Sequence, residues 1–320
     1  MSASAAGKSA SFRMVATVWT RGGVFMALLL LVAVASFLSP RFLTLPNLLN
    51  VLRQVAIVGI LALGMTFVIL TRGIDLSVGA ILGMSVVLYA GLLEHNGMVV
   101  AIPLGLAAAM AAGLVNGAGI AYAGIPPFIM TLGMLSFARG LAFIYTGGTP
   151  IPILSEAFYD LGNGYLLGIP IPTLILIAVL IASAIVLALT PFGRCIYGIG
   201  SNEDAARLSG VPVRRYKAMA YAISGGVSGL AGLVYASQLS IGTPIAGQGY
   251  ELDAIAAVVV GGTSLFGGKG SVFGTFVGTL IIGVLANILN LTGVDPFVQQ
   301  LFKGVLIVVA VFIMSRSHRA

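Results

Sequence analysis

The sequence contains few charged residues: 8% of its 320 residues are Asp, Glu, Lys or Arg, whereas 59% are hydrophobic. A soluble domain carries about a quarter charged residues, so this chain cannot cover a water-facing surface. Its mean hydropathy of +1.10 and its apolar runs of about 20 residues indicate an all-α, polytopic membrane protein. The runs do not alternate in polarity as the strands of a membrane β-barrel do, which argues against that architecture.

Groups that could support catalysis or metal binding are also scarce. Cys195 is the single cysteine, which excludes an internal disulfide and a cysteine-based metal cage. The two histidines, His95 and His318, lie outside the apolar runs and suggest no metal site. No nucleophile, base and acid occur together, so neither a membrane enzyme nor a bound cofactor is expected. The first apolar run lacks an A-x-A-like exit, so we expect no cleavable signal peptide.

Three acidic residues lie near membrane depth, but none of the nine in the sequence lies in the middle of an apolar run. Asp75 is expected to cap the helix that follows it. Glu251 and Asp253 are expected to begin a helix near the outer surface, where negative charge complements a helix N-terminus. A carrier driven by protons or sodium usually needs an acid in mid-helix, so this absence makes an ion-coupled carrier the weaker alternative. The basic side chains at similar depth can snorkel to the interface, namely Arg53, Arg139 and Lys303.

The apolar runs predict ten membrane segments, of which the first and the eighth are short. They are 24–38, 48–70, 75–93, 98–122, 127–146, 170–190, 216–238, 250–262, 271–292 and 297–314. With the N-terminus inside, twelve of the sixteen basic residues fall on cytoplasmic segments, as the positive-inside rule requires. The net charge of +7 is therefore explained by membrane anchoring rather than by nucleic-acid binding.

This topology divides the chain into one domain and two tails. Residues 1–23 form a flexible cytoplasmic tail, residues 24–315 a single transmembrane domain, and residues 316–320 a second cytoplasmic tail. Within the domain, the loop 191–215 faces the cytoplasm and belongs to the longest polar interval of the sequence. Two further loops, 147–169 and 241–250, face outside and could meet a partner or act as plain connectors.

The polar interval contains a short helix with both ends marked. Asn202 is a good N-cap, and Glu203 and Asp204 put negative charge into the first turn. Gly210 suits the position after the helix, and Pro212 prevents its continuation, so we expect a helix over 203–209. So short a helix is marginal in water, which indicates that a membrane surface or a partner protein holds it. The alternative is an ordinary interfacial turn.

Glycines recur at four-residue spacing within the apolar runs. They form small-xxx-small faces that allow close helix packing, more readily within one chain than between chains. The pairs are Gly79–Gly83, Gly113–Gly117, Gly225–Gly229 and the run Gly270–Gly274–Gly278. The neighbouring stretch 262–271, GTSLFGGKGS, fails the Gly-x4-Gly-Lys-Ser/Thr pattern of a phosphate-binding loop, so this chain is not expected to bind a nucleotide.

Three stretches resemble one known family: residues 71–79, TRGIDLSVG; residues 200–210, GSNEDAARLSG; and residues 249–270, GYELDAIAAVVVGGTSLFGGKG. Together they resemble the membrane permease subunits of bacterial ABC importers for monosaccharides, the ribose permease branch in particular. The resemblance runs from about Ser39 to the end of the tenth segment. It implies a vitamin B12-permease-like (type II importer) fold of about ten helices in the bacterial inner membrane.

The resemblance also implies partners. They are a second copy of the chain, a cytoplasmic ATPase subunit that binds ATP and Mg²⁺, and a periplasmic sugar-binding protein. The short helix would couple to the ATPase through an EAA-like motif in which Asp204 or Glu203 supplies the acid. The implied coupling residues are Asn202, Glu203, Asp204, Ala205, Ala206, Arg207, Leu208 and Gly210.

The residues that meet the solute are less defined by the sequence. Asn50, Gln54, Thr66 and Asn116 are candidates for the translocation path, although each could instead hydrogen-bond across helices. Candidate contacts with the binding protein are Gln248, Tyr250, Glu251 and Asp253. Ribose is the leading solute by resemblance, ahead of xylose, arabinose, galactose or a polyol. A related permease for branched-chain amino acids is a nearer alternative than the ion-coupled carrier.

Overall fold

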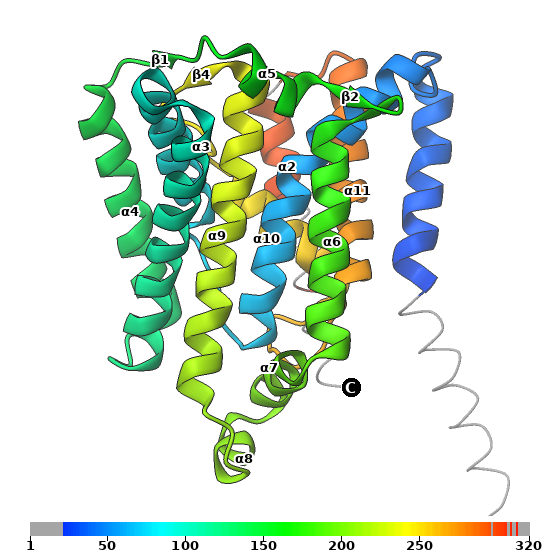
Figure 1. Cartoon of the computed structure of the whole chain (residues 1–320). Helices are drawn as coiled ribbons and strands as arrows, with labels where there is room; N and C mark the ends of the chain where they lie inside the picture. Colours follow the sequence, from blue (N-terminus) through cyan, green and yellow to red (C-terminus); the bar gives the residue numbers. More distant parts are fainter. Residues whose placement is uncertain (1–21, 296, 306–307, 309–311, 313–320) are drawn as a thin grey trace, which may run out of the picture.

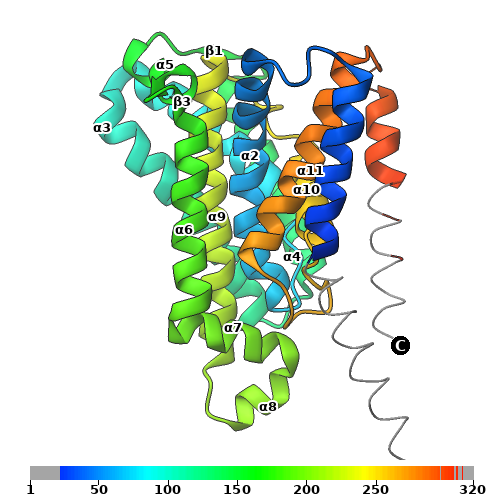
Figure 2. The same ribbon diagram turned by 90° about the vertical axis from the view of Figure 1, so that its right-hand side faces the viewer.

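The chain folds, in a computed structural model, into a single bundle of helices (Figures 1 and 2). The structure describes residues 22–295, 297–305, 308 and 312, so nearly all of the two predicted tails lies outside it. A first helix spans Gly22–Leu38, and a last helical stretch covers residues 297–305. Between them lie α2 Leu45–Leu70, α3 Val78–Ala121, α4 Pro127–Thr146, α5 Glu156–Asn163, α6 Ile171–Leu189, α7 Pro191–Ser201, α8 Glu203–Leu208, α9 Val213–Leu239, α10 Tyr250–Val260 and α11 Val272–Leu291.

Six of the described helices are long and apolar enough to cross a membrane: α2, α3, α4, α6, α9 and α11. The chain is therefore a polytopic helical membrane protein, as its composition predicts. Helix α3 contains 44 residues and bends at Gly97, whose φ of 67° interrupts the helical backbone. This bend coincides with the predicted break between segments 75–93 and 98–122. The two predicted short segments remain short: the first helix has 17 residues and α10 has 11.

Helix α2 lies at the centre of the bundle and packs against α6, α9, α10 and α11. Residues 59–70 of α2 are all buried, because a helix that is apolar on every face can be surrounded by other helices. Thr66 supplies the polar contact there: its hydroxyl donates to the Ala62 carbonyl and lies 2.8 Å from the Thr275 hydroxyl of α11.

The glycine faces bring helices of this chain together. A methyl group on Gly113 of α3 would overlap the carbonyl oxygen of Tyr221 in α9, and one on Gly225 of α9 would overlap that of Ala109. Likewise, a methyl group on Gly278 of α11 would overlap the Ala257 carbonyl of α10. Packing within one chain, the favoured interpretation of these faces, is confirmed at these three positions.

Short strands and helices close the two ends of the bundle (Figure 1). At one end, here termed the strand end, β1 (Ile151–Pro152) pairs with β4 (Ile241–Gly242) and β2 (Tyr165–Leu166) pairs with β3 (Ile169–Pro170). Helix α5 lies at this end, and the Ser237 hydroxyl of α9 donates to its Phe158 carbonyl. Helices α7 and α8 lie at the opposite end, termed the α8 end.

Residues 243–249 run from β4 into the bundle, so that α10 lies between the two ends (Figure 1). Two left-handed turns, at Gly247 (φ 71°) and Gly249 (φ 85°), redirect this segment before α10 begins. On α4, the Arg139 guanidinium donates to the carbonyls of Pro244 (2.6 Å) and Ala246 (2.7 Å). Non-helical backbone at membrane depth requires such protein partners because lipid offers none. Arg139 therefore does not snorkel, contrary to expectation.

The prediction that Glu251 and Asp253 lie near the outer surface is wrong. Asp253 is only 7% exposed, and its carboxylate lies 2.9 Å from the Lys303 ammonium. Glu251 is half-buried and accepts a hydrogen bond from the Gly249 amide. Because 243–249 fold inward, the N-terminus of α10 begins inside the bundle.

Asp75 also lies deeper than expected. It is fully buried, and one carboxylate oxygen accepts from the backbone and hydroxyl of Ser77, at the N-terminus of α3. The other accepts from Ser224 of α9 at 3.0 Å. Asp75 thus supports the start of α3 as predicted. It lies in the non-helical segment 71–77, which folds between α3 and α9, so it is buried without occupying a mid-helix position.

Candidate functional site

At the α8 end, the short helix α8 lies between α7 and the start of α9 and is capped at both ends. The Asn202 side chain accepts a hydrogen bond from the Ala205 amide at 3.0 Å, which confirms the predicted N-cap. Gly210 has a φ of 81°, in the left-handed region, and Pro212 precedes the next helix. The helix ends at Leu208, one residue earlier than predicted, because Ser209 leaves the helical conformation. Two independent caps therefore define α8.

Glu203 binds α8 to the beginning of α9. Its carboxylate pairs with Arg207 at 3.1 Å along the same helix, and with the ammonium of Lys217 in α9. Partial burial by itself raises the pKa of the Glu203 carboxyl, but hydrogen bonds and charge from Lys217 and Arg207 outweigh burial and lower this pKa below its ordinary value. Glu203 is thus held ionised and directed toward the protein.

One face of α8 packs against the chain, and the other faces outward. Ala206 is buried in a small cluster with Ile199 of α7 and Val213 of α9. Leu208 is 90% exposed, and Asp204 is exposed beside it. The capped helix therefore exposes one large apolar side chain and one carboxylate on its outward face.

A groove of about 470 Å³ lies between α7 and α8. Its lining includes Arg194, Gly198, Asn202, Ala205, Ala206 and Val211. Three of these residues, Asn202, Ala205 and Ala206, belong to the coupling set expected from the sequence. The groove therefore includes three of the expected coupling residues, of which Asn202 and Ala205 are exposed.

The four expected path residues separate into two pairs. Thr66 and Asn116 are fully buried; Thr66 contacts Thr275, and the Asn116 amide donates to Ser77 at 2.8 Å. Thr66 therefore hydrogen-bonds across helices, the alternative noted for it, and Asn116 hydrogen-bonds across the bend of α3 to the N-cap residue of that helix. Asn50 and Gln54 are exposed on α2, toward the strand end, where nearby Arg53 donates to the Tyr165 hydroxyl of β2 at 2.6 Å.

The expected binding-protein contacts surround the start of α10. Gln248 is exposed, Tyr250 and Glu251 are partly buried, and Asp253 is buried. Because these residues lie between the two ends of the bundle, a contact with a binding protein remains a prediction that their position does not favour.

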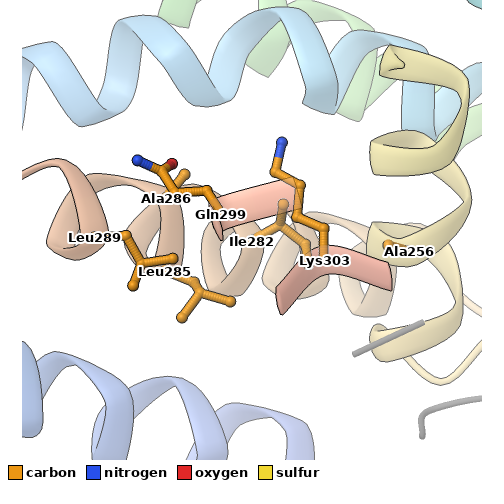
Figure 3. Close-up of a pocket in the computed structure, with 7 residues that line it drawn as sticks. All are labelled: Ala256, Ile282, Leu285, Ala286, Leu289, Gln299 and Lys303. Atoms are coloured by element: carbon orange, nitrogen blue, oxygen red, sulfur yellow. The ribbon is translucent and has the colours of Figure 1, made fainter. Parts of the chain in front are cut away.

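A cavity between α10, α11 and the last helix is too small for a sugar. It measures about 10 Å³ and is lined by Ala256, Ile282, Leu285, Ala286, Leu289, Gln299 and Lys303 (Figure 3). A space of this size holds one water molecule at most. Gln299 is held there by hydrogen bonds to the Asn290 side chain (2.8 Å) and the Val294 carbonyl (2.9 Å). This contact between α10, α11 and the last helix is therefore packing rather than a sugar site.

The polar groups that organise the interior could not be paired with one another from the sequence. Asp75, Ser77, Asn116 and Ser224 form one hydrogen-bonded cluster, and Asp253 pairs with Lys303. The sequence does contain a signal for them, because an ionisable residue inside an apolar run costs free energy unless it has a partner. Their partners could not be identified because they come from segments far apart in the sequence.

Comparisons with known proteins identify the family of this chain. The family model described as "branched-chain amino acid transport system / permease component" matches residues 47–311. A ribose import permease of Bacillus subtilis (strain 168) is 49% identical over 294 residues, 91% of each chain. That of Escherichia coli (strain K12) is 45% identical over 299 residues, covering 92% of this chain and 93% of the relative.

A permease for another sugar is similar at lower identity. The L-arabinose ABC transporter permease of Azospirillum brasilense is 39% identical over 292 residues, 91% of this chain and 86% of the relative. No solved structure matches the chain significantly. From the extent of the family match and the identity to these relatives, the chain belongs to the membrane permease family that includes the ribose import permeases.

Proposed function

We propose that this chain is the permease subunit of an ATP-driven importer that carries ribose across the bacterial inner membrane. The observation that carries the proposal is the 49% identity to a ribose import permease over 91% of each chain. The relative named for L-arabinose is less similar, at 39%, so another pentose or related sugar is the second candidate. The same comparison disfavours branched-chain amino acids, which the family description mentions.

The topology proposed is that of the vitamin B12-permease-like fold, with about ten helices and both termini in the cytoplasm. The bend of α3 at Gly97, together with the short first helix and α10, supports more crossings than the six long helices alone. Basic residues gather at the α8 end, among them Arg194, Arg207 and Arg214. This distribution favours the α8 end as the cytoplasmic one.

The proposed partner at the α8 end is an ATPase subunit that binds ATP and Mg²⁺, because this chain lacks a phosphate-binding loop. Its surface would receive α8 through the exposed Leu208 and the groove between α7 and α8. Since Glu203 is engaged with Lys217, the exposed Asp204 is the better candidate for the acid of the coupling motif. ATP-driven movement of the ATPase would then displace a rigid, capped element.

The proposed path lies between two copies of the chain, where a periplasmic binding protein delivers the sugar. Thr66 and Asn116 are occupied inside one copy, which leaves Asn50 and Gln54 as the better path candidates. Gln248 is exposed in the segment that leads into α10, so we assign it to the proposed path rather than to an outer docking surface.

Uptake of labelled ribose into proteoliposomes tests the proposal. They would carry the chain with its ATPase and binding protein, with or without ATP, and with a catalytically inactive ATPase as control. ATP-dependent accumulation that the inactive ATPase abolishes is expected. Accumulation of L-arabinose but not ribose would replace the substrate, and uptake driven by an ion gradient without ATPase would overturn the importer assignment.

A further inference from the structure

Three chain segments meet at the α8 end in a contact that we term the inner junction. The first follows α2, the second ends α7, and the third belongs to the loop between α10 and α11. Its residues are Leu70, Arg72, Gly200, Ser201, Gly267 and Gly268. None of them belongs to the predicted coupling set, yet Ser201 is only two residues from the start of α8.

Arg72 makes the central contacts of the junction. Its Nε donates to the Gly200 carbonyl at 2.7 Å, and its Nη2 donates to the Ser201 carbonyl at 2.6 Å. These are the last two carbonyls of α7, which have no partner within the helix. They also lie at the negative end of the α7 dipole, so a cation is favoured there. The planar guanidinium spans both carbonyls at once, which a lysine ammonium cannot do with the same fixed geometry.

The parts of the junction are closely packed. The Gly268 amide donates to the Leu70 carbonyl at 3.0 Å, and a methyl group on Gly200 would overlap that same carbonyl. A methyl group on Gly267 would overlap the stem of Arg72. Arg72 itself has a φ of 65°, a left-handed conformation that a non-glycine residue keeps only when its surroundings impose it. The three segments are therefore in direct contact with one another at this point.

The segment that begins with Arg72 is fixed at its other end in the core. Three residues later, the buried Asp75 accepts hydrogen bonds from Ser77 of the α3 N-terminus and from Ser224 of α9. Asn116, farther along α3, donates to Ser77. Residues 71–77 thus connect the end of α7 directly to the contact between α3 and α9.

We propose that Arg72 is a positioning residue that transmits displacement of α8 to the transmembrane helices. A force on α8 reaches α7 through Asn202, passes through the two α7 carbonyls to Arg72, and moves α3 and α9 through residues 71–77. The inference rests on the proposed function, since it takes α8 to be the element displaced by the ATPase. It adds a second connection, besides α9 itself, between the coupling helix and the bundle.

The test compares Arg72→Gly and Arg72→Lys with the wild-type chain in the complete importer. Glycine removes the guanidinium but tolerates the left-handed backbone, so the change isolates the side chain. Lysine keeps the positive charge but cannot donate to both α7 carbonyls with the fixed geometry of a guanidinium. Arg41→Ala, which removes an exposed arginine near the strand end, is the matched control.

The measured quantity is the number of ATP molecules hydrolysed per ribose imported. Co-purification of the ATPase reports binding of that partner, and elution of the variant as a single species in size-exclusion chromatography reports folding. Arg72→Gly is expected to raise this ratio roughly 2- to 30-fold, the range over which residues between two sites modulate their coupling. Arg72→Lys is expected to raise it less, Arg41→Ala not at all, and both Arg72 variants are expected to retain the ATPase. If Arg72→Gly does not fold, Arg72→Lys decides the question by the same ratio.

A wild-type ratio in a folded Arg72 variant would overturn the proposal, and so would loss of ATPase binding, which would give Arg72 a docking role instead. Failure of the importer assignment is recognised separately, because the wild-type complex would then show no ATP-dependent ribose uptake at all.

Discussion

At the scale of single residues, some side chains of α8 contact the rest of the chain and others are exposed. Glu203 and Ala206 face the chain, one through Lys217 and the other through an apolar cluster. Asp204 and Leu208 face outward. Changes to the two groups should therefore separate loss of transport from loss of stability.

Leu208→Asp should abolish most transport without destabilising the chain. Because Leu208 is 90% exposed, its replacement should change the free energy of unfolding by less than about 0.5 kcal/mol. Loss of an apolar anchor in a protein interface costs about 1–2 kcal/mol or more, so ATP-dependent uptake at limiting ATPase should fall about tenfold. Thermal unfolding and uptake assays check both statements. Leu208→Met, which keeps an apolar side chain, should behave as wild type; equal uptake by Leu208→Asp would contradict the role assigned to this residue.

Gly210→Leu should impair uptake through the backbone rather than through a lost contact. Gly210 has a φ of 81°, and a left-handed conformation costs a residue with a side chain about 1–2 kcal/mol. The strain should loosen the C-terminal cap of α8 and lower ATP-dependent uptake in a well-expressed protein. Gly210→Asn is the matched variant, because asparagine tolerates this conformation better. Normal uptake by Gly210→Leu would show that the cap does not matter.

At the scale of elements, the bundle depends on close approach between helices rather than on burial alone. In lipid, apolar surface gains little by moving from lipid to protein, so tight packing over small residues supplies the attraction. The α3–α9 contact shows this, with Gly113 beside the Tyr221 backbone and Gly225 beside that of Ala109. The same two helices receive the segment that begins at Arg72.

Two glycine-to-alanine changes should therefore have opposite effects. In Gly113→Ala the added methyl group meets the Tyr221 carbonyl, and such overpacking costs about 1–3 kcal/mol. Gly133 lies inside α4 with nothing within 4 Å of an added methyl group, so Gly133→Ala should be neutral or stabilising by about 0.5–1 kcal/mol. Thermal unfolding in detergent measures both. A melting temperature for Gly113→Ala equal to that of Gly133→Ala would exclude the packing role of this contact.

At the scale of the whole molecule, ion pairs and hydrogen bonds connect segments whose polar groups would find no partner in lipid. Arg139 of α4 holds the segment that enters α10. Lys303 of the last helix pairs with Asp253 of α10. Both contacts place a charge within the bundle, where an unpartnered charge would be costly.

The pair between Asp253 and Lys303 should show strong coupling in a double-mutant cycle. Lys303→Met leaves a carboxylate that is only 7% exposed without its ammonium, which should cost roughly 1–3 kcal/mol, less than a fully buried pair because Lys303 is partly exposed. Adding Asp253→Asn should restore part of that loss, since no charge is then left unpaired. Melting temperatures of the wild type, both single variants and the double variant give the coupling energy. Additive losses would show that the two side chains do not interact in solution.

The sequence alone determined the features that depend on local chemistry. Low charge and long apolar runs established a helical membrane protein. Asn202 and Gly210 located α8 to within one residue at its C-terminus, because caps act on neighbouring backbone groups. Three short stretches also identified the family, which the comparisons confirm.

Only the tertiary structure decided which distant groups meet. It placed Asp75 and Asp253 inside the bundle, gave Arg139 and Lys303 partners, and joined Arg72 to the end of α7. These positions follow from two non-helical segments, 71–77 and 243–249, that fold inward between helices. No local pattern encodes that course, because such backbone is stable at membrane depth only when helices from elsewhere in the chain supply its hydrogen-bond partners.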